Sequence, residues 1–101
     1  MNSINNIEKI RQRLADGKVA IGTAITFADS AVSELTAEAD YDFTWIDTEH
    51  TALDLNTVLQ HVVACRGTST AAFVRVRQNE ANVIKPVLDL APAGIIVPRV
   101  N

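Results

Sequence analysis

Apolar residues follow two alternating patterns along the chain, one with helical spacing and one forming short continuous runs. Apolar positions three or four residues apart predict amphipathic helices over residues 5–16, 29–39, 54–66 and 79–88. The short runs between them predict buried strands over residues 19–25, 43–47, 71–76 and 94–98. Strand centres recur about every 23 to 28 residues, the size of a strand–helix–strand unit. The sequence therefore predicts a parallel sheet covered by helices.

Capping residues and one proline indicate where these helices begin and end. Short polar side chains can accept the free backbone N–H groups of a first turn. Such residues precede each predicted helix: Asn5 or Asn6, Asp29 or Ser30, Asp54, and Asn79. Pro86 predicts a kink or break near Lys85. The apolar faces of the helices comprise Ile7, Ile10 and Leu14; Val32 and Leu35; Leu55, Val58, Leu59, Val62 and Val63; and Val83, Ile84, Val87 and Leu88.

Composition narrows the class of protein. With 101 residues, 48% of them hydrophobic, the chain is long enough for one domain with one core. The net charge is −3 and no basic run occurs, so we expect no nucleic-acid surface. Apolar runs are far shorter than the ~20 residues that span a bilayer, and the N-terminus lacks signal-peptide features. The one cysteine, Cys65, excludes an internal disulfide, fits a reducing cytoplasm, and is predicted to be a buried structural thiol.

Polar residues collect where the predicted strands end. They are Asp47, Glu49 and His50 after the second strand, Arg75 and Arg77 after the third, and Arg99 and Asn101 after the fourth. Parallel strands end at one edge of a sheet, where α/β proteins bind their ligands. A histidine base and an arginine that grips a carboxylate suit proton abstraction on a carboxylate-bearing substrate. The alternatives are a solvated acidic turn at residues 47–50 and a surface salt bridge for Arg75.

Four segments resemble the first half of the HpcH/HpaI class II pyruvate aldolases. They are Ile46–His50, Val74–Arg75, Val87–Leu90 and Ile96–Pro98. The resemblance implies an α/β fold of the (β/α)₈ TIM-barrel family, of which only the first four strands and their helices are present. By this resemblance residues 1–101 are the N-terminal half of a barrel domain. Residues 1–17 would form the N-terminal helix, and residues 18–101 four βα units, the last one incomplete.

The resemblance also implies roles for five residues. His50 is the catalytic base, and Asp89 pairs with it and orients the imidazole. Arg75 is both a catalytic and a substrate-binding residue, because it holds the pyruvate oxygens and stabilises the enolate. Asp47 and Glu49 flank the histidine and are expected to support the site rather than to bind a metal directly.

The implied reaction is cleavage of a 2-keto-4-hydroxy acid to pyruvate and an aldehyde. It is assisted by a divalent ion, Mg²⁺ in the first place or else Mn²⁺ or Co²⁺, whose Glu and Asp ligands would lie beyond Asn101. We expect a cytoplasmic homo-oligomer with no nucleic-acid or membrane partner. The alternative is a non-catalytic half-barrel that acts only as a self-associating or complementing module through its open strand edges.

Overall fold

The computed structural model describes residues 6–100, so Asn5 and Asn101 lie outside the described residues. Helices and strands alternate as α1 (Ile7–Ala15), β1 (Gly22–Ile25), α2 (Ala31–Glu38), β2 (Phe43–Asp47), α3 (Leu55–Cys65), β3 (Ala71–Arg75), α4 (Ala81–Leu88) and β4 (Gly94–Ile96). The sheet order is β1-β2-β3-β4, and every neighbouring pair is parallel. The predicted order of elements is confirmed, although β1, β3 and β4 are shorter than expected. No described helix is long and apolar enough to cross a membrane.

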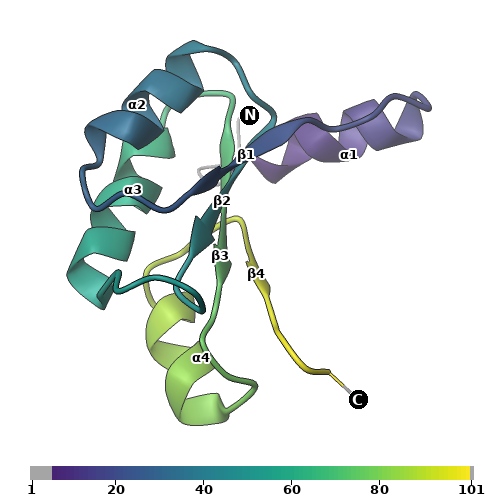
Figure 1. Ribbon diagram of the computed structural model, residues 1–101. Coiled ribbons are helices and arrows are strands. Elements are labelled where there is room, and N and C mark those ends of the chain that lie inside the picture. The colour runs from purple at the N-terminus through teal and green to yellow at the C-terminus, as the bar shows by residue number, and fades with distance from the viewer. Residues whose placement is uncertain (1–5, 101) are drawn as a thin grey trace.

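The three later helices cover one face of the sheet. Figure 1 shows α2, α3 and α4 on the same side of the strands, whereas α1 lies apart from them. Ile46 and Val74 are neighbours on β2 and β3, and both are fully buried against this helix layer. Val58 and Val62 of α3 complete the contact, and Cys65 is buried beside them as predicted. The core therefore lies between sheet and helices, because only alternate strand residues face that side.

The opposite face of the sheet carries partly exposed aromatic residues. Phe43 and Phe73 point to this side and meet edge to face, with ring centroids 5.6 Å apart. A Cβ atom on Gly22 would lie 2.3 Å from the Phe43 ring, and one on Gly94 would lie 2.9 Å from the Phe73 ring. Glycine at these two strand positions therefore makes room for the rings. No described helix covers this side, which we call the open face.

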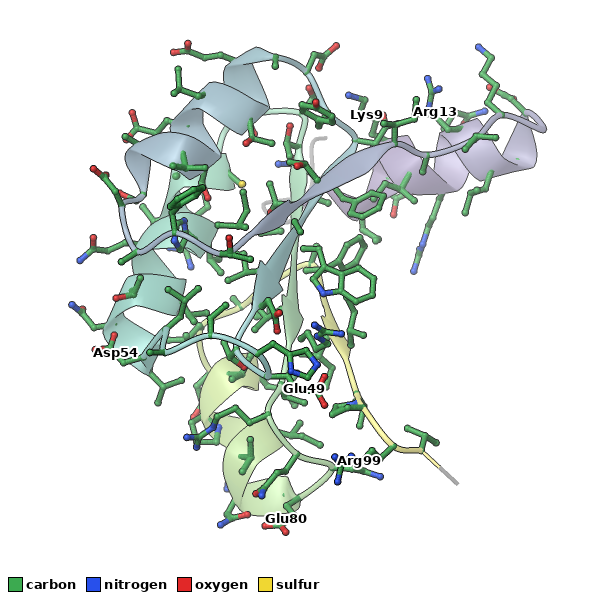
Figure 2. The ribbon with its side chains drawn as sticks, in the orientation of Figure 1. Lys9, Arg13, Glu49, Asp54, Glu80 and Arg99 are labelled. Carbon is green, nitrogen blue, oxygen red and sulfur yellow. The ribbon has the colours of Figure 1, made fainter. Side chains whose placement is uncertain are left out.

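Helix α1 is held at the edge where the strands begin, which we call the amino edge. Arg13 Nε lies 3.1 Å and Lys9 Nζ 3.4 Å from the carboxylate of Asp42, which is nearly buried. The same carboxylate accepts the backbone N–H of Ile21 at 2.8 Å. Because Asp42 directly precedes β2, this contact joins α1 to the start of the sheet. Figure 2 places Lys9 and Arg13 at the end of the molecule opposite Glu49 and Arg99.

The predicted helix caps have mixed outcomes. Asp54 caps α3 as predicted, because its carboxylate accepts a first-turn backbone N–H at 2.9 Å. Asp29 likewise accepts a backbone N–H at the start of α2. Asn6 precedes α1, but its side chain donates to the carbonyls of two residues far along the chain and does not cap the helix. The prediction for Asn79 is wrong, since α4 begins after Glu80, whose side chain makes no capping bond.

Several apolar residues assigned to inward helix faces are instead exposed. They are Leu14, Leu35, Leu55, Val63 and Leu88. The buried positions of α2 include Ser33, Thr36 and Ala37, so Leu35 lies on the other side of the helix. In α3 the buried positions include His61. Polar residues occupy the contact between α2 and α3. The sides of the two helices that face inward therefore differ from those that the apolar residues alone predict.

Helix α4 runs through its proline. It is continuous from Ala81 to Leu88 with Pro86 inside it, so the predicted break near Lys85 is wrong. A proline at this position removes one backbone N–H, whose partner would have been the carbonyl of Asn82. The ladder is intact further along, where the Asp89 N–H donates to the Lys85 carbonyl at 3.1 Å. One missing bond is tolerated here because Val87 is buried in the core.

A buried histidine joins three parts of the fold. The Nδ1 atom of His61 lies 2.6 Å from the Ser33 hydroxyl, and its Nε2 atom lies 2.8 Å from the Phe27 carbonyl. A carbonyl can only accept, so Nε2 carries the proton and Nδ1 accepts from Ser33. Burial is the main cause that lowers the pKa of His61 below its ordinary value of 6.5. The contact fastens the loop between β1 and α2 to the helix layer.

We expect the chain to lose stability as the pH falls from about 7.5 to about 5.5. Because the pKa of His61 is lower in the folded state, the unfolded chain takes up a proton first once the pH drops below 6.5. Urea unfolding followed by circular dichroism should show a lower midpoint at the acidic end. His61→Gln removes the titrating group, so its midpoint should change much less. Equal pH slopes for both proteins would contradict this assignment.

Candidate active site

The predicted site residues of β2 and β3 meet at the edge where the strands end, which we call the carboxyl edge. Asp47 is the last residue of β2 and Arg75 the last of β3, and the two are paired in register. Glu49 and His50 follow in the loop after β2. Figure 2 shows Glu49 and Arg99 toward this same end of the sheet. The sharing of one edge, which parallel strands predict, is therefore observed.

Asp47 is the most connected residue of the site. Its Oδ1 atom accepts from Arg75 Nε at 3.1 Å, and its Oδ2 atom accepts from Arg75 Nη2 at 2.8 Å. Oδ1 also accepts the backbone N–H groups of Glu49 and His50, at 2.8 and 3.2 Å. The guanidinium of Arg75 is the main cause that holds the pKa of Asp47 below its ordinary value. Asp47 therefore stays ionised and fixes both Arg75 and the loop of His50.

Arg75 is held on two sides. Asp47 takes its Nε and Nη2 atoms, and the guanidinium carbon lies 5.4 Å from the centre of the Trp45 ring. The hydrogen bonds to Asp47 are also the main reason that the pKa of Arg75 is raised. Within residues 6–100, Nη1 has no hydrogen-bond or ion-pair partner. That side of the guanidinium is free for a ligand, and a hollow of about 370 Å³ adjoins Trp45, Asp47 and Arg75 on the open face.

Glu49 lies between the two predicted catalytic residues. One of its oxygens, Oε1, is 3.2 Å from His50 Nε2 and 3.4 Å from Arg75 Nε. The Glu49 side chain is mostly buried, with 16% of its surface exposed, whereas that of His50 is 69% exposed. The histidine therefore stands at the surface of the carboxyl edge, beside an arginine and a nearly enclosed carboxylate.

Two threonines that the sequence patterns did not single out fix the loop. Thr48 donates both its backbone N–H and its hydroxyl to the Arg75 carbonyl. The Thr51 hydroxyl donates to the Asp47 carbonyl four residues earlier. Their spacing around the acidic residues is the only signal that could have found them, because hydroxyl side chains commonly bond nearby backbone groups in turns. Together these bonds attach the His50 loop to the ends of β2 and β3.

The structure does not bring Asp89 to His50 within one copy of the chain, and their pairing stays a prediction. Asp89 is the residue that ends α4, and the next residue, Leu90, accepts a hydrogen bond at its carbonyl from Arg66, just after the end of α3. Helices of βα units run back against the strand direction, so the ends of α3 and α4 lie at the amino edge. His50 lies at the carboxyl edge, and its carboxylate partner there is Glu49.

Further polar residues border the site without joining it. Arg77 and Arg99 are exposed at the carboxyl edge and form no ion pair with the described residues. Arg77, Thr48 and Asn82 line a cleft of about 490 Å³ between the first turns of α3 and α4, on the helix side of the sheet. Its other walls are largely apolar. The cleft is thus separate from the hollow beside Arg75.

The described residues do not form a metal centre. No group of three or more His, Cys, Asp or Glu side chains among residues 6–100 could hold a metal ion. Both oxygens of Asp47 are occupied by Arg75 and two backbone N–H groups, and the Oε1 atom of Glu49 is shared by His50 and Arg75. The acidic residues present support the arginine and the histidine. That metal ligands follow Asn101 stays a prediction.

The chain is similar to known aldolases over nearly its whole length. It is 34% identical over 93 residues to the 5-keto-4-deoxy-D-glucarate aldolase of Klebsiella pneumoniae. This alignment covers 92% of this chain and 36% of the relative. It is 28% identical over 95 residues to the hydroxypyruvate/pyruvate aldolase of Roseobacter denitrificans, which covers 94% of this chain and 37% of the relative. The chain thus spans little more than a third of these proteins, in their N-terminal part.

The fold comparison gives the same result. The crystal structure of the citrate synthase SbnG superposes with a TM-score of 0.80 and 34% identity, covering 90% of this chain and 37% of that one. The predicted fold class, the first four strands of a TIM-barrel protein, is confirmed. A model of the HpcH/HpaI aldolase/citrate lyase family matches residues 24–101. The chain therefore belongs to the HpcH/HpaI aldolase/citrate lyase family.

Proposed function

We propose that this chain is part of an aldolase that cleaves a 2-keto-4-hydroxy acid to pyruvate and an aldehyde through a pyruvate enolate. The observation that carries the proposal is the grouping of three residues at the carboxyl edge, where Glu49 Oε1 lies 3.2 Å from His50 Nε2 and 3.4 Å from Arg75 Nε. An exposed imidazole can accept a proton at neutral pH, and a neighbouring guanidinium can bind a carboxylate. The names of the relatives, which include keto-acid aldolases, support this reaction class.

Each residue would have a distinct part in the reaction. The free Nη1 side of Arg75 would bind the substrate carboxylate and the keto oxygen, and its charge would stabilise the oxyanion as it forms. His50 would take the proton of the 4-hydroxyl group as the bond between C3 and C4 breaks. The bonding electrons would pass to the keto oxygen and leave an enolate. The proton that His50 has taken up would then pass to C3 of the enolate and give pyruvate, so the same imidazole would move the proton that methyl exchange measures. Asp47 would keep Arg75 and the His50 loop in place.

The remaining parts of the site would come from outside the described residues. A divalent ion, Mg²⁺ or else Mn²⁺ or Co²⁺, would be held by Glu and Asp side chains beyond Asn101, and it would supply Lewis-acid stabilisation of negative charge. Residues 1–101 would then be the N-terminal half of a barrel domain, with a helix at 1–17 and βα units over 18–101. We also propose a cytoplasmic homo-oligomer.

The test measures exchange of the pyruvate methyl protons for deuterium, which reports enolisation alone. Residues 1–101 would be joined to the remaining, C-terminal part of the Klebsiella relative, which supplies the rest of a barrel. We expect His50→Ala to slow exchange by about 10²–10⁴-fold, the usual contribution of proton-transfer catalysis. Gln78→Ala, an exposed residue of the loop after β3, is the matched control and should keep the full rate. Exchange at the original rate in His50→Ala would refute the assignment.

A further inference from the structure

The indole ring of Trp45 lies beside the guanidinium of Arg75. The guanidinium carbon is 5.4 Å from the ring centre, within the distance at which a cation is attracted to an aromatic face. Trp45 and Asp47 are two residues apart on β2, so their side chains point to the same side of the sheet, the open face. Asp47 is the direct partner of Arg75 on β3, and Trp45 is its diagonal neighbour, two residues nearer the amino edge. One strand therefore holds the arginine with two different groups, a carboxylate and an aromatic ring.

We propose that Trp45 is a positioning residue that fixes the guanidinium of Arg75 for the substrate carboxylate. This inference rests on the proposed function in assigning that carboxylate to Arg75. Asp47 binds Nε and Nη2 of the guanidinium, and the Trp45 ring covers it from the side of the amino edge. Nη1, which has no hydrogen-bond or ion-pair partner among residues 6–100, then remains for the substrate.

An aromatic ring suits this position better than another carboxylate would. The ring attracts the cation through its face and takes up none of the N–H groups that a substrate needs. The partners of Trp45 in register are Ala24 on β1 and Phe73 on β3, neither of which is charged, so the ring is free to attract Arg75. In a complete barrel the open face turns inward, and the attraction strengthens as water is displaced. The contact therefore limits the motion of Arg75 without occupying its binding side.

A double-mutant cycle tests the contact without an assay of activity. It uses the chimera of residues 1–101 with the C-terminal part of the Klebsiella relative, and urea unfolding gives the unfolding constant of each variant. Trp45→Leu should raise this constant by a factor that is roughly two to five times larger when Arg75 is present than in Arg75→Met, the contribution of one cation–π contact. Tyr41→Leu replaces an aromatic residue before β2 at the amino edge and is the matched control, so its factor should be the same in both backgrounds. Equal factors for Trp45→Leu would overturn the inference.

Deuterium exchange of pyruvate in the same chimera tests the role in binding. Trp45→Leu should raise KM by roughly fivefold, because Arg75 is less often in place for the carboxylate. Trp45→Phe keeps an aromatic face, so its KM should stay within about twofold of the parent value, and it also serves if Trp45→Leu does not fold. A side chain that only fills space would be replaced as well by Leu as by Phe, so equal KM values for the two variants would contradict the role in binding. Absence of exchange in the unsubstituted chimera would refute the proposed function, while the double-mutant cycle would still decide the contact.

Discussion

Replacing Asp47 by Asn should disturb the arginine and the histidine loop at once. The carboxylate accepts two hydrogen bonds from Arg75 and two from backbone N–H groups of the following loop. An Asn side chain offers one carbonyl oxygen and one NH₂ group, so a donor would face the guanidinium where Oδ2 accepts now. In the chimera of residues 1–101 with the C-terminal part of the Klebsiella relative, we expect the deuterium exchange of pyruvate to slow by about 10²-fold. A displaced catalytic group typically has an effect of this size. The melting temperature should fall by at least about 5 °C.

Asp54→Asn is the matched control for this change. Asp54 is an exposed helix cap at the start of α3, and Asn serves as well as Asp in that position. We therefore expect the control to keep its melting temperature and its exchange rate. If Asp47→Asn keeps the melting temperature and the exchange rate as Asp54→Asn does, then Asp47 does not hold Arg75 and the His50 loop in place.

The effect of Asp47 should also depend on pH in a defined direction. Its pKa in the folded chain lies below the ordinary value of 3.8, mainly because of Arg75. The stabilisation is therefore fully present above pH 3.8 and is lost as the pH falls through the lower, folded-state value. Melting temperatures of the parent and Asp47→Asn should accordingly converge only in strong acid.

The order of strands and helices could be predicted because apolar spacing reports burial directly. Ile46 and Val74 lie in short apolar runs, and both are fully buried between sheet and helices. The common edge of His50 and Arg75 followed from the same step, since every strand in a parallel sheet ends at one side. The register that places Asp47 beside Arg75 could not be predicted, because it depends on how two distant segments align.

Polar burial explains why the predicted inward faces of α2 and α3 are wrong. Ser33 and His61 are polar, so the sequence pattern places them at the surface. In the structure both are buried and hydrogen-bonded to each other, and their contact decides which sides of α2 and α3 face inward. The role predicted for Asp89 rests on resemblance alone and stays a prediction, because resemblance between short segments carries no information on which edge a helix end reaches. Glu49, adjacent to His50, was recognised only as a supporting carboxylate. Its contacts with His50 and Arg75 could not be predicted, because they depend on how β2 and β3 lie beside each other in space.

Residues 1–101 on their own should self-associate and should not catalyse the aldol reaction. The open face exposes aromatic surface around Phe43, Trp45 and Phe73, and β1 and β4 each have one unpaired edge. At about 25 cal/mol per Å², a few hundred Å² of apolar surface in water costs several kcal/mol. That is comparable with the whole stability of a small domain, about 5–15 kcal/mol. In a barrel the interior is filled by layers of side chains from all strands, which this chain supplies only in part.

Sedimentation of the purified chain over a range of concentrations measures this association. If the open face is the contact, Phe73→Ser should shift the equilibrium toward monomer, since it removes apolar surface from the centre of that face. Leu35→Ser is the matched control: Leu35 is 65% exposed but belongs to α2 on the helix side, so its replacement should leave association unchanged. Adding the C-terminal part of the Klebsiella relative should compete with self-association by covering the same face. A folded monomer that binds Mg²⁺ and pyruvate without that part would show that the chain holds a complete site, and the need for an opposing half would then be disproved.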